Sequence, residues 1–100
     1  MDQRLKLSAK LHALRDNVYY QPPETIRMKY PCILYSFQGF ADRFADDRRH
    51  IKIERYLVTH IYLDPDDHKR EEFLASNTYV SFDRTYTADG LHHDVYDFYM

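Results

Sequence analysis

The feature that most constrains this fold is a run of strand-forming residues at positions 51–64, which reads I-K-I-E-R-Y-L-V-T-H-I-Y-L-D. Isoleucine, tyrosine, leucine, valine and threonine dominate the run, and these residues suit a pleated, half-buried surface. Side chains alternate along a strand, so one face carries Ile53, Arg55, Leu57, Thr59, Ile61 and Leu63, and the other carries Tyr56, Val58, His60 and Tyr62. Both faces are largely apolar. We therefore expect helices of the same domain to cover the first face, and a C-terminal hairpin or a neighbouring subunit to cover the second.

The other elements predict a single α+β domain that spans residues 1–100. An N-terminal amphipathic helix is expected at 2–15, a second short helix at 68–75, a short extended segment at 17–21, and strands at 32–37, 78–86 and 91–100. Pro22 and Pro23 end the extended segment, because proline cannot donate a hydrogen bond to a sheet. Asp89 and Gly90, between the last two strands, are typical of a hairpin turn. We predict a mainly antiparallel sheet of about four to five strands, with both helices on one face.

Composition narrows the class of protein. The formal net charge of −2 lacks the basic excess that a general nucleic-acid binder carries. Aromatic residues make up 16% of the chain and include ten tyrosines, which excludes a disordered chain and favours an interaction surface, although tyrosine also suits strands. The single cysteine, Cys32, is expected to be a reduced core residue. Because no signal peptide and no bilayer-long apolar run is present in the sequence, we expect synthesis in the cytoplasm and no membrane partner.

Residues 38–50, Q-G-F-A-D-R-F-A-D-D-R-R-H, are too charged for a core and too long for a tight hairpin. We predict a long mobile loop here. It is either simply solvated, or it becomes ordered against a neighbouring subunit, since its two phenylalanines have no obvious place in a small core. The residues predicted to make such contacts are Phe40, Phe44, Asp46, Asp47, Arg48 and Arg49 from this loop, and Tyr19, Tyr20, Tyr56 and Tyr62 from strand faces.

The possible chemistry in the sequence is weak. His92, His93 and Asp94 resemble a metal cluster, but neighbouring residues on a strand point to opposite faces, so only His92 and Asp94 share one. His60 is the candidate for a further ligand, or for an acid–base pair with His93, but no spacing brings these residues together. D-P-D-D at 64–67 fits a turn and a helix cap better than a calcium loop. We predict no catalytic, cofactor-binding or metal-binding residues.

Several blocks of sequence together resemble one family. They are N-V-Y-Y-Q-P-P at 17–23, M-K-Y-P-C-I-L-Y at 28–35, F-A-D-D at 44–47, R-Y-L-V-T at 55–59, D-P-D-D at 64–67 and F-D-R-T-Y-T-A-D-G-L-H-H at 82–93. In these blocks the chain is similar to the tail terminator, or tail completion, proteins of long-tailed bacteriophages, the group related to the lambda tail terminator. The acidic and basic residues at 46–50 depart from the family pattern, which has asparagine and lysine there.

The resemblance implies a structural protein of the virion. Such a protein forms a ring, usually a hexamer of itself, on the last ring of the tail tube protein. It stops tube polymerisation and offers the surface that joins the connector or stopper protein of the head, and DNA passes through its lumen without specific binding. The expected location is the head-proximal end of the tail, and the host cytoplasm during assembly. The alternatives are another head–tail connector component, such as an adaptor, a stopper or a minor capsid protein, and, more distantly, a small histidine- or metal-dependent hydrolase.

Overall fold

The computed structural model describes the backbone of residues 3–44 and 50–100. It describes the side chains of residues 3–41 and 53–100. Its elements are α1 (Gln3–His12), β1 (Val18–Tyr20), β2 (Cys32–Phe44), β3 (His50–Tyr62), α2 (Arg70–Ala75), β4 (Val80–Ala88) and β5 (Leu91–Tyr99). The two helices and all five strands begin and end close to the predicted segments, except for β2. Neither helix in the described chain is long and apolar enough to cross a membrane.

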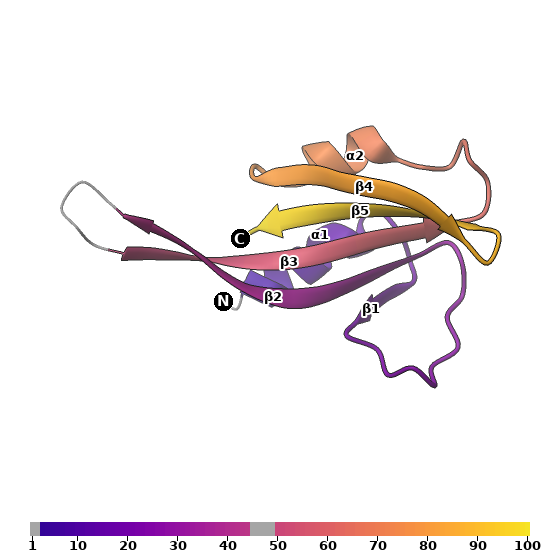
Figure 1. The fold of residues 1–100 in the computed structure, drawn as a ribbon, viewed down its shortest axis with the longest axis horizontal. Helices are drawn as coiled ribbons and strands as arrows, with labels where there is room; N and C mark the ends of the chain where they lie inside the picture. Colours follow the sequence, from indigo (N-terminus) through magenta and orange to yellow (C-terminus); the bar gives the residue numbers. More distant parts are fainter. Residues whose placement is uncertain (1–2, 45–49) are drawn as a thin grey trace.

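The five strands form one mixed sheet in the order β1-β2-β3-β5-β4, with β3 at its centre (Figure 1). The pair β1–β2 is parallel, and the other three pairs are antiparallel. The predicted α+β domain, with a mainly antiparallel sheet, an N-terminal helix and a short second helix, is confirmed.

The predicted turn between β4 and β5 is confirmed in its details. Asp89 and Gly90 both have positive φ angles, 52° and 75°. Two consecutive positive φ angles define the type I′ turn, whose twist matches that of an antiparallel hairpin, and Asp-Gly is a preferred pair for it. The turn sets Ala88 opposite Leu91 and so starts the β4–β5 register.

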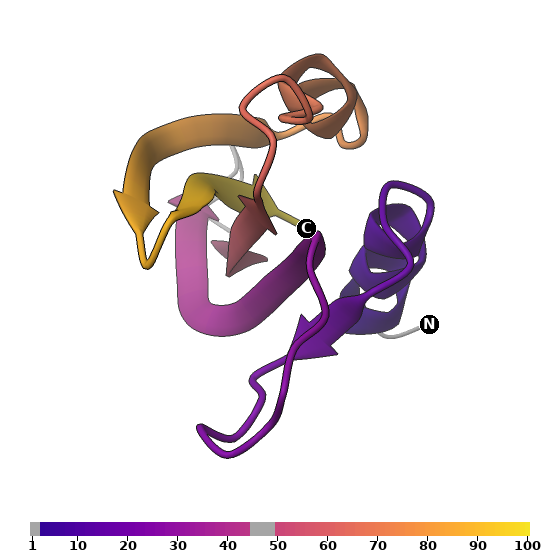
Figure 2. The ribbon, with the colours of Figure 1, turned by 90° about the vertical axis from the view of Figure 1, so that its right-hand side faces the viewer.

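The core lies on the sheet face that both helices cover, which we call the helix face (Figure 2). Leu7 and Leu11 of α1 and Phe73 of α2 are fully buried. They pack with the buried sheet residues Ile33, Tyr35, Tyr56, Val58, Tyr96 and Phe98. Burial of so many large apolar side chains is the main stabilising contribution in a domain of this size.

Our prediction assigned the two faces of β3 the wrong way round. The helices cover the face with Tyr56, Val58, His60 and Tyr62, each at most 2% exposed. The outer face instead carries Arg55, whose guanidinium pairs with Asp97 at 3.1 Å, and Leu63, which is 69% exposed. The physical reason is the charge of Arg55, because placing a guanidinium under a helix without a buried partner is costly.

The prediction of a loop over residues 38–50 was wrong where the structure describes that segment. β2 continues to Phe44 and β3 begins at His50, and the two strands pair from Phe40 opposite Glu54 to Phe44 opposite His50. These residues, 38–44 of β2 and 50–54 of β3, form a two-stranded arm that projects beyond the rest of the sheet (Figure 1). The molecule measures 50 × 27 × 22 Å, and its radius of gyration of 14.6 Å exceeds the ~13 Å of a compact domain of this length.

Candidate functional site

A β-bulge marks the base of the arm. Phe37 lies opposite Tyr56 and Gly39 lies opposite Arg55, so Gln38 is an extra residue in β2. Gly39 has a φ of 126°, which side-chain-bearing residues rarely adopt. In a regular strand, residues three positions apart point to opposite faces, but the bulge brings Phe37 and Phe40 together, with ring centroids 5.2 Å apart.

The bulge extends a row of aromatic rings from the core onto the arm. Phe37 lies 5.6 Å from Tyr56, Tyr56 lies 6.3 Å from Tyr35, and Tyr35 lies 4.7 Å from Tyr20, measured between ring centroids. The middle of the row is buried, whereas Phe40 at the arm end is 58% exposed and Tyr20 at the other end is 37% exposed. An exposed aromatic surface that continues a core is a typical docking surface for another protein.

The sheet has an open edge on each side. Within the described chain, β4 pairs with β5 alone, and β1 pairs with β2 only over residues 33–35. The outer edge of β4 carries two exposed aromatic residues, Phe82 at 40% and Tyr86 at 45% exposure. β4 also has a bulge at Asp83, since Phe82 lies opposite Tyr96 and Arg84 opposite Val95. Unpaired edges of this length are templates for pairing with another chain.

A hollow of about 320 Å³ lies where the arm meets the start of β4. Ala41 and Ile53 of the arm line it together with residues 78–81 and Tyr99. These side chains are apolar or carry hydroxyl groups, so the hollow offers apolar contact and no charged group for recognition of a small molecule.

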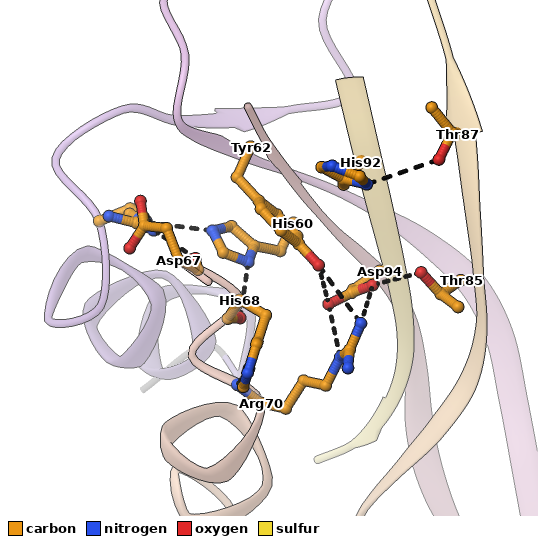
Figure 3. A network of polar contacts seen from close by, with 10 residues as sticks. His60, Tyr62, Asp67, His68, Arg70, Thr85, Thr87, His92 and Asp94 are labelled. Atoms are coloured by element: carbon orange, nitrogen blue, oxygen red, sulfur yellow. Dashed lines mark hydrogen bonds and ion pairs between the residues drawn. The ribbon is translucent and has the colours of Figure 1, made fainter. Parts of the chain in front are cut away.

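Polar residues on the helix face, next to the start of α2, form a hydrogen-bonded network outside the arm (Figure 3). His60 is one of its two centres. Its Nε2 accepts a hydrogen bond of 3.0 Å from Nε of Arg15, so the ring proton is on Nδ1, which donates to the backbone oxygen of His68 at 3.0 Å. Burial, and secondly the charge of Arg15, lower the pKa of His60 to about 4. Both ring nitrogens of this neutral histidine are therefore engaged within the fold.

Asp94 is the second centre of the network and lies opposite His60 in the β3–β5 register. Its buried carboxylate accepts hydrogen bonds from the hydroxyl of Tyr62 at 2.9 Å, from Nε of Arg70 at 3.0 Å and from the hydroxyl of Thr85 at 2.7 Å (Figure 3). Burial raises the pKa of Asp94, but the hydrogen bonds from Arg70, Thr85 and Tyr62 outweigh it and hold the pKa below its usual value. The carboxylate links β3, β4, β5 and the start of α2.

The residues considered for metal or acid–base chemistry do not gather in one place. His92 stacks on Tyr62 on the helix face, with ring centroids 5.3 Å apart, whereas His93 stacks on Tyr86 at 4.6 Å on the outer face. His60 and His93 therefore lie on opposite faces of the sheet. In the described part of the chain, no group of three or more His, Cys, Asp or Glu side chains is placed to hold a metal ion.

The ten predicted contact residues fall into three groups. Phe40 and Tyr20 are exposed, and Phe44 is the last residue of β2. Tyr19 is half-buried, and its hydroxyl accepts a hydrogen bond of 3.2 Å from the backbone N–H of Lys29. Tyr56 and Tyr62 are core residues, because strand alternation places them under the helices, and that prediction was wrong. Asp46, Asp47, Arg48 and Arg49 lie outside the described residues.

Sequence reasoning missed the open edge of β4 and the role of Phe37. The available signals were the F-x-G-F spacing across Gly39, which indicates a bulge, and the aromatic residues of F-D-R-T-Y at 82–86.

No protein-family model matches the sequence, and the search of curated proteins finds no match.

Proposed function

We propose that this protein is a structural assembly subunit of a long-tailed bacteriophage virion, of the tail terminator type. In this proposal, copies of the chain form a ring, with a hexamer as the expected size, on the end of the tail tube. The ring stops polymerisation of the tube protein and presents the surface that the head connector or stopper protein joins.

The observation that carries the proposal is the projecting arm with its exposed aromatic row. A two-stranded hairpin is marginally stable alone in water, so an arm of this kind gains stability when another protein surface covers it. Phe37 and Phe40 are 37% and 58% exposed, and they supply apolar area for such a contact. A ring subunit needs surfaces of this kind for its neighbours and its axial partners.

The use of the polar residues also supports a structural role. Both ring nitrogens of His60 and the carboxylate of Asp94 bond to groups of the same chain, so these residues stabilise the fold. The net charge of −2 is compatible with a lumen through which DNA slides without sticking.

Deletion of the gene from the phage that encodes it tests the proposal. Loss of a terminator should give abnormally long tails and full heads without tails, as seen by electron microscopy, and the wild-type gene supplied in trans should restore both. Tails of normal length together with unattached heads would instead indicate another connector component. Normal virions would contradict both functions.

A further inference from the structure

The arm strand of β2 and the edge strand β4 have similar sequences, and each has one edge that pairs with no other strand in the described chain. The arm strand reads F-A-D-R-F at 40–44, and β4 reads F-D-R-T-Y at 82–86. Each strand places an aromatic residue two positions away from a charged one: Phe40 and Asp42 on the arm, Tyr86 and Arg84 on β4. Residues two positions apart on a strand share a face, so each pair acts as one unit of recognition.

One antiparallel register between the two strands satisfies both units at once. If Phe40 lies opposite Tyr86, then Asp42 lies opposite Arg84, and Ala41 lies opposite Thr85. Aromatic pairs and opposite charges directly across a strand pair are both stabilising. The bulge at Asp83 lies beyond this stretch, which is the regular part of β4 from Arg84 onward.

Pairing between identical edges cannot satisfy both units. Two copies of the arm that align Phe40 with Phe44 place Asp42 opposite Asp42. Like charges directly opposite each other are destabilising. A register that pairs the opposite charges of two arms loses the aromatic alignment. Two copies of β4 cannot align Phe82 with Tyr86, because the bulge at Asp83 leaves Phe82 against Tyr96 on the helix face and Tyr86 against His93 on the outer face. The sequences therefore favour arm-to-β4 pairing over both symmetric alternatives.

We propose that the arm of one copy adds as an antiparallel strand to the outer edge of β4 in the next copy, with Phe40 opposite Tyr86 and Asp42 opposite Arg84. This inference rests on the proposed ring, and it identifies the contact between neighbouring subunits. The contact joins two different surfaces, so it repeats head to tail and generates a ring when the rotation closes. Main-chain hydrogen bonds provide affinity, and the aromatic and charged pairs fix the register.

Charge exchange at this contact provides the test. Asp42→Arg and Arg84→Asp each turn the attractive pair into a repulsive one at every interface. Each variant alone should lower the association constant, measured by sedimentation velocity, by about tenfold. Equal amounts of the two variants should recover association, because each arm then meets an edge of opposite charge. Asp16→Arg and Arg27→Asp, at exposed positions outside the arm and β4, are the matched controls for the change in net charge.

Folding of the variants is checked by circular dichroism. Arg84 should tolerate substitution because its side chain is 61% exposed and its ion pair with the neighbouring Asp83, at 3.4 Å, lies at the surface. Loss of association in each variant and its recovery in the mixture would support the pairing. An effect of Arg84→Asp without an effect of Asp42→Arg would show that the arm is not the partner of β4 and overturn the proposal. Unchanged association in both variants would also overturn it, as would a wild-type chain that stays monomeric up to millimolar concentration. The proposed function is judged separately, by the tail lengths after gene deletion.

Discussion

Replacement of Asp94 by asparagine tests the buried network directly. The carboxylate accepts hydrogen bonds from Tyr62 at 2.9 Å, Arg70 at 3.0 Å and Thr85 at 2.7 Å, so both of its oxygens face donors. Asparagine has nearly the same shape, but it replaces one oxygen with an amide group that donates. In Asp94→Asn one donor therefore faces another donor inside the protein, and Arg70 loses its counter-charge.

The size of the effect follows from the burial of the two partners. Breaking a buried ion pair by removing one charge costs about 3–5 kcal/mol, much of it from the charge left behind. Asp94 is fully buried, whereas the Arg70 side chain is 42% exposed and can turn toward water. We therefore expect the lower end of the range, about 3 kcal/mol. For a domain of this length this lowers Tm by about 12–24 °C.

The assay is thermal and urea unfolding at neutral pH, followed by circular dichroism. Asp97→Asn is the matched control, because Asp97 lies on the same strand and pairs with the exposed guanidinium of Arg55 on the outer face. The Asp97 side chain is 13% exposed and that of Arg55 44%, so water reaches this pair, and the variant should shift Tm much less. Equal shifts in Asp94→Asn and Asp97→Asn would refute the reasoning that burial makes the Asp94 network stabilising.

Three further predictions concern single side chains. Burial and a neighbouring guanidinium lower the pKa of His60 to about 4, so between about pH 6.5 and about pH 4 the unfolded chain binds a proton that the folded chain does not. Stability in urea should therefore fall as the pH drops through this window. In His60→Gln this loss of stability should be smaller. In His12→Gln, a change at an exposed position, it should be the same as in the wild type. The buried hydroxyl of Tyr96 has no hydrogen-bond partner among the described residues, so Tyr96→Phe should leave Tm unchanged or raise it. Tyr62→Phe removes a hydrogen bond to a carboxylate and should cost about 1.5–3 kcal/mol, so a larger loss in Tyr96→Phe would contradict this comparison. Gly39→Ala should strain the bulge by about 1–3 kcal/mol and speed hydrogen exchange in the arm, and unchanged exchange there would show that the bulge tolerates a side chain.

The body of the fold could be predicted because its signals are local. A run of strand-forming residues indicates β3, the Asp89-Gly90 pair indicates the β4–β5 hairpin, and Pro22 with Pro23 ends the first extended segment. Each of these signals depends on a few neighbouring residues and on the backbone angles they allow. The structure confirms them within a few residues.

The arm could not be predicted in this way, because its strand structure comes from pairing and not from composition. Residues 38–44 extend beyond the helices, so they do not need an apolar face, and their sequence lacks the alternation that identifies a strand. The bulge at Gln38 also changes which residues share a face. The network around His60 and Asp94 could not be predicted either, because its partners come from four separate parts of the chain. They are the segment after α1, the segment before α2, α2 itself and β4, and only the folded chain brings these together.

β3 connects the network to the arm, and this connection suggests why a small domain keeps a buried ion pair. Replacing such a pair with apolar residues often stabilises a protein, so stability alone does not explain it. The bond from Tyr62 to Asp94 fixes β3 against β5, and the bond from Arg70 to Asp94 holds α2 on the same point of the sheet. A slip of one residue would turn His60 and Tyr62 to the outer face. Because β3 also sets the register of β2, the same bonds determine which residues lie on the arm. We infer that the network keeps β3 in its correct register, because an interface formed by strand pairing requires a defined register.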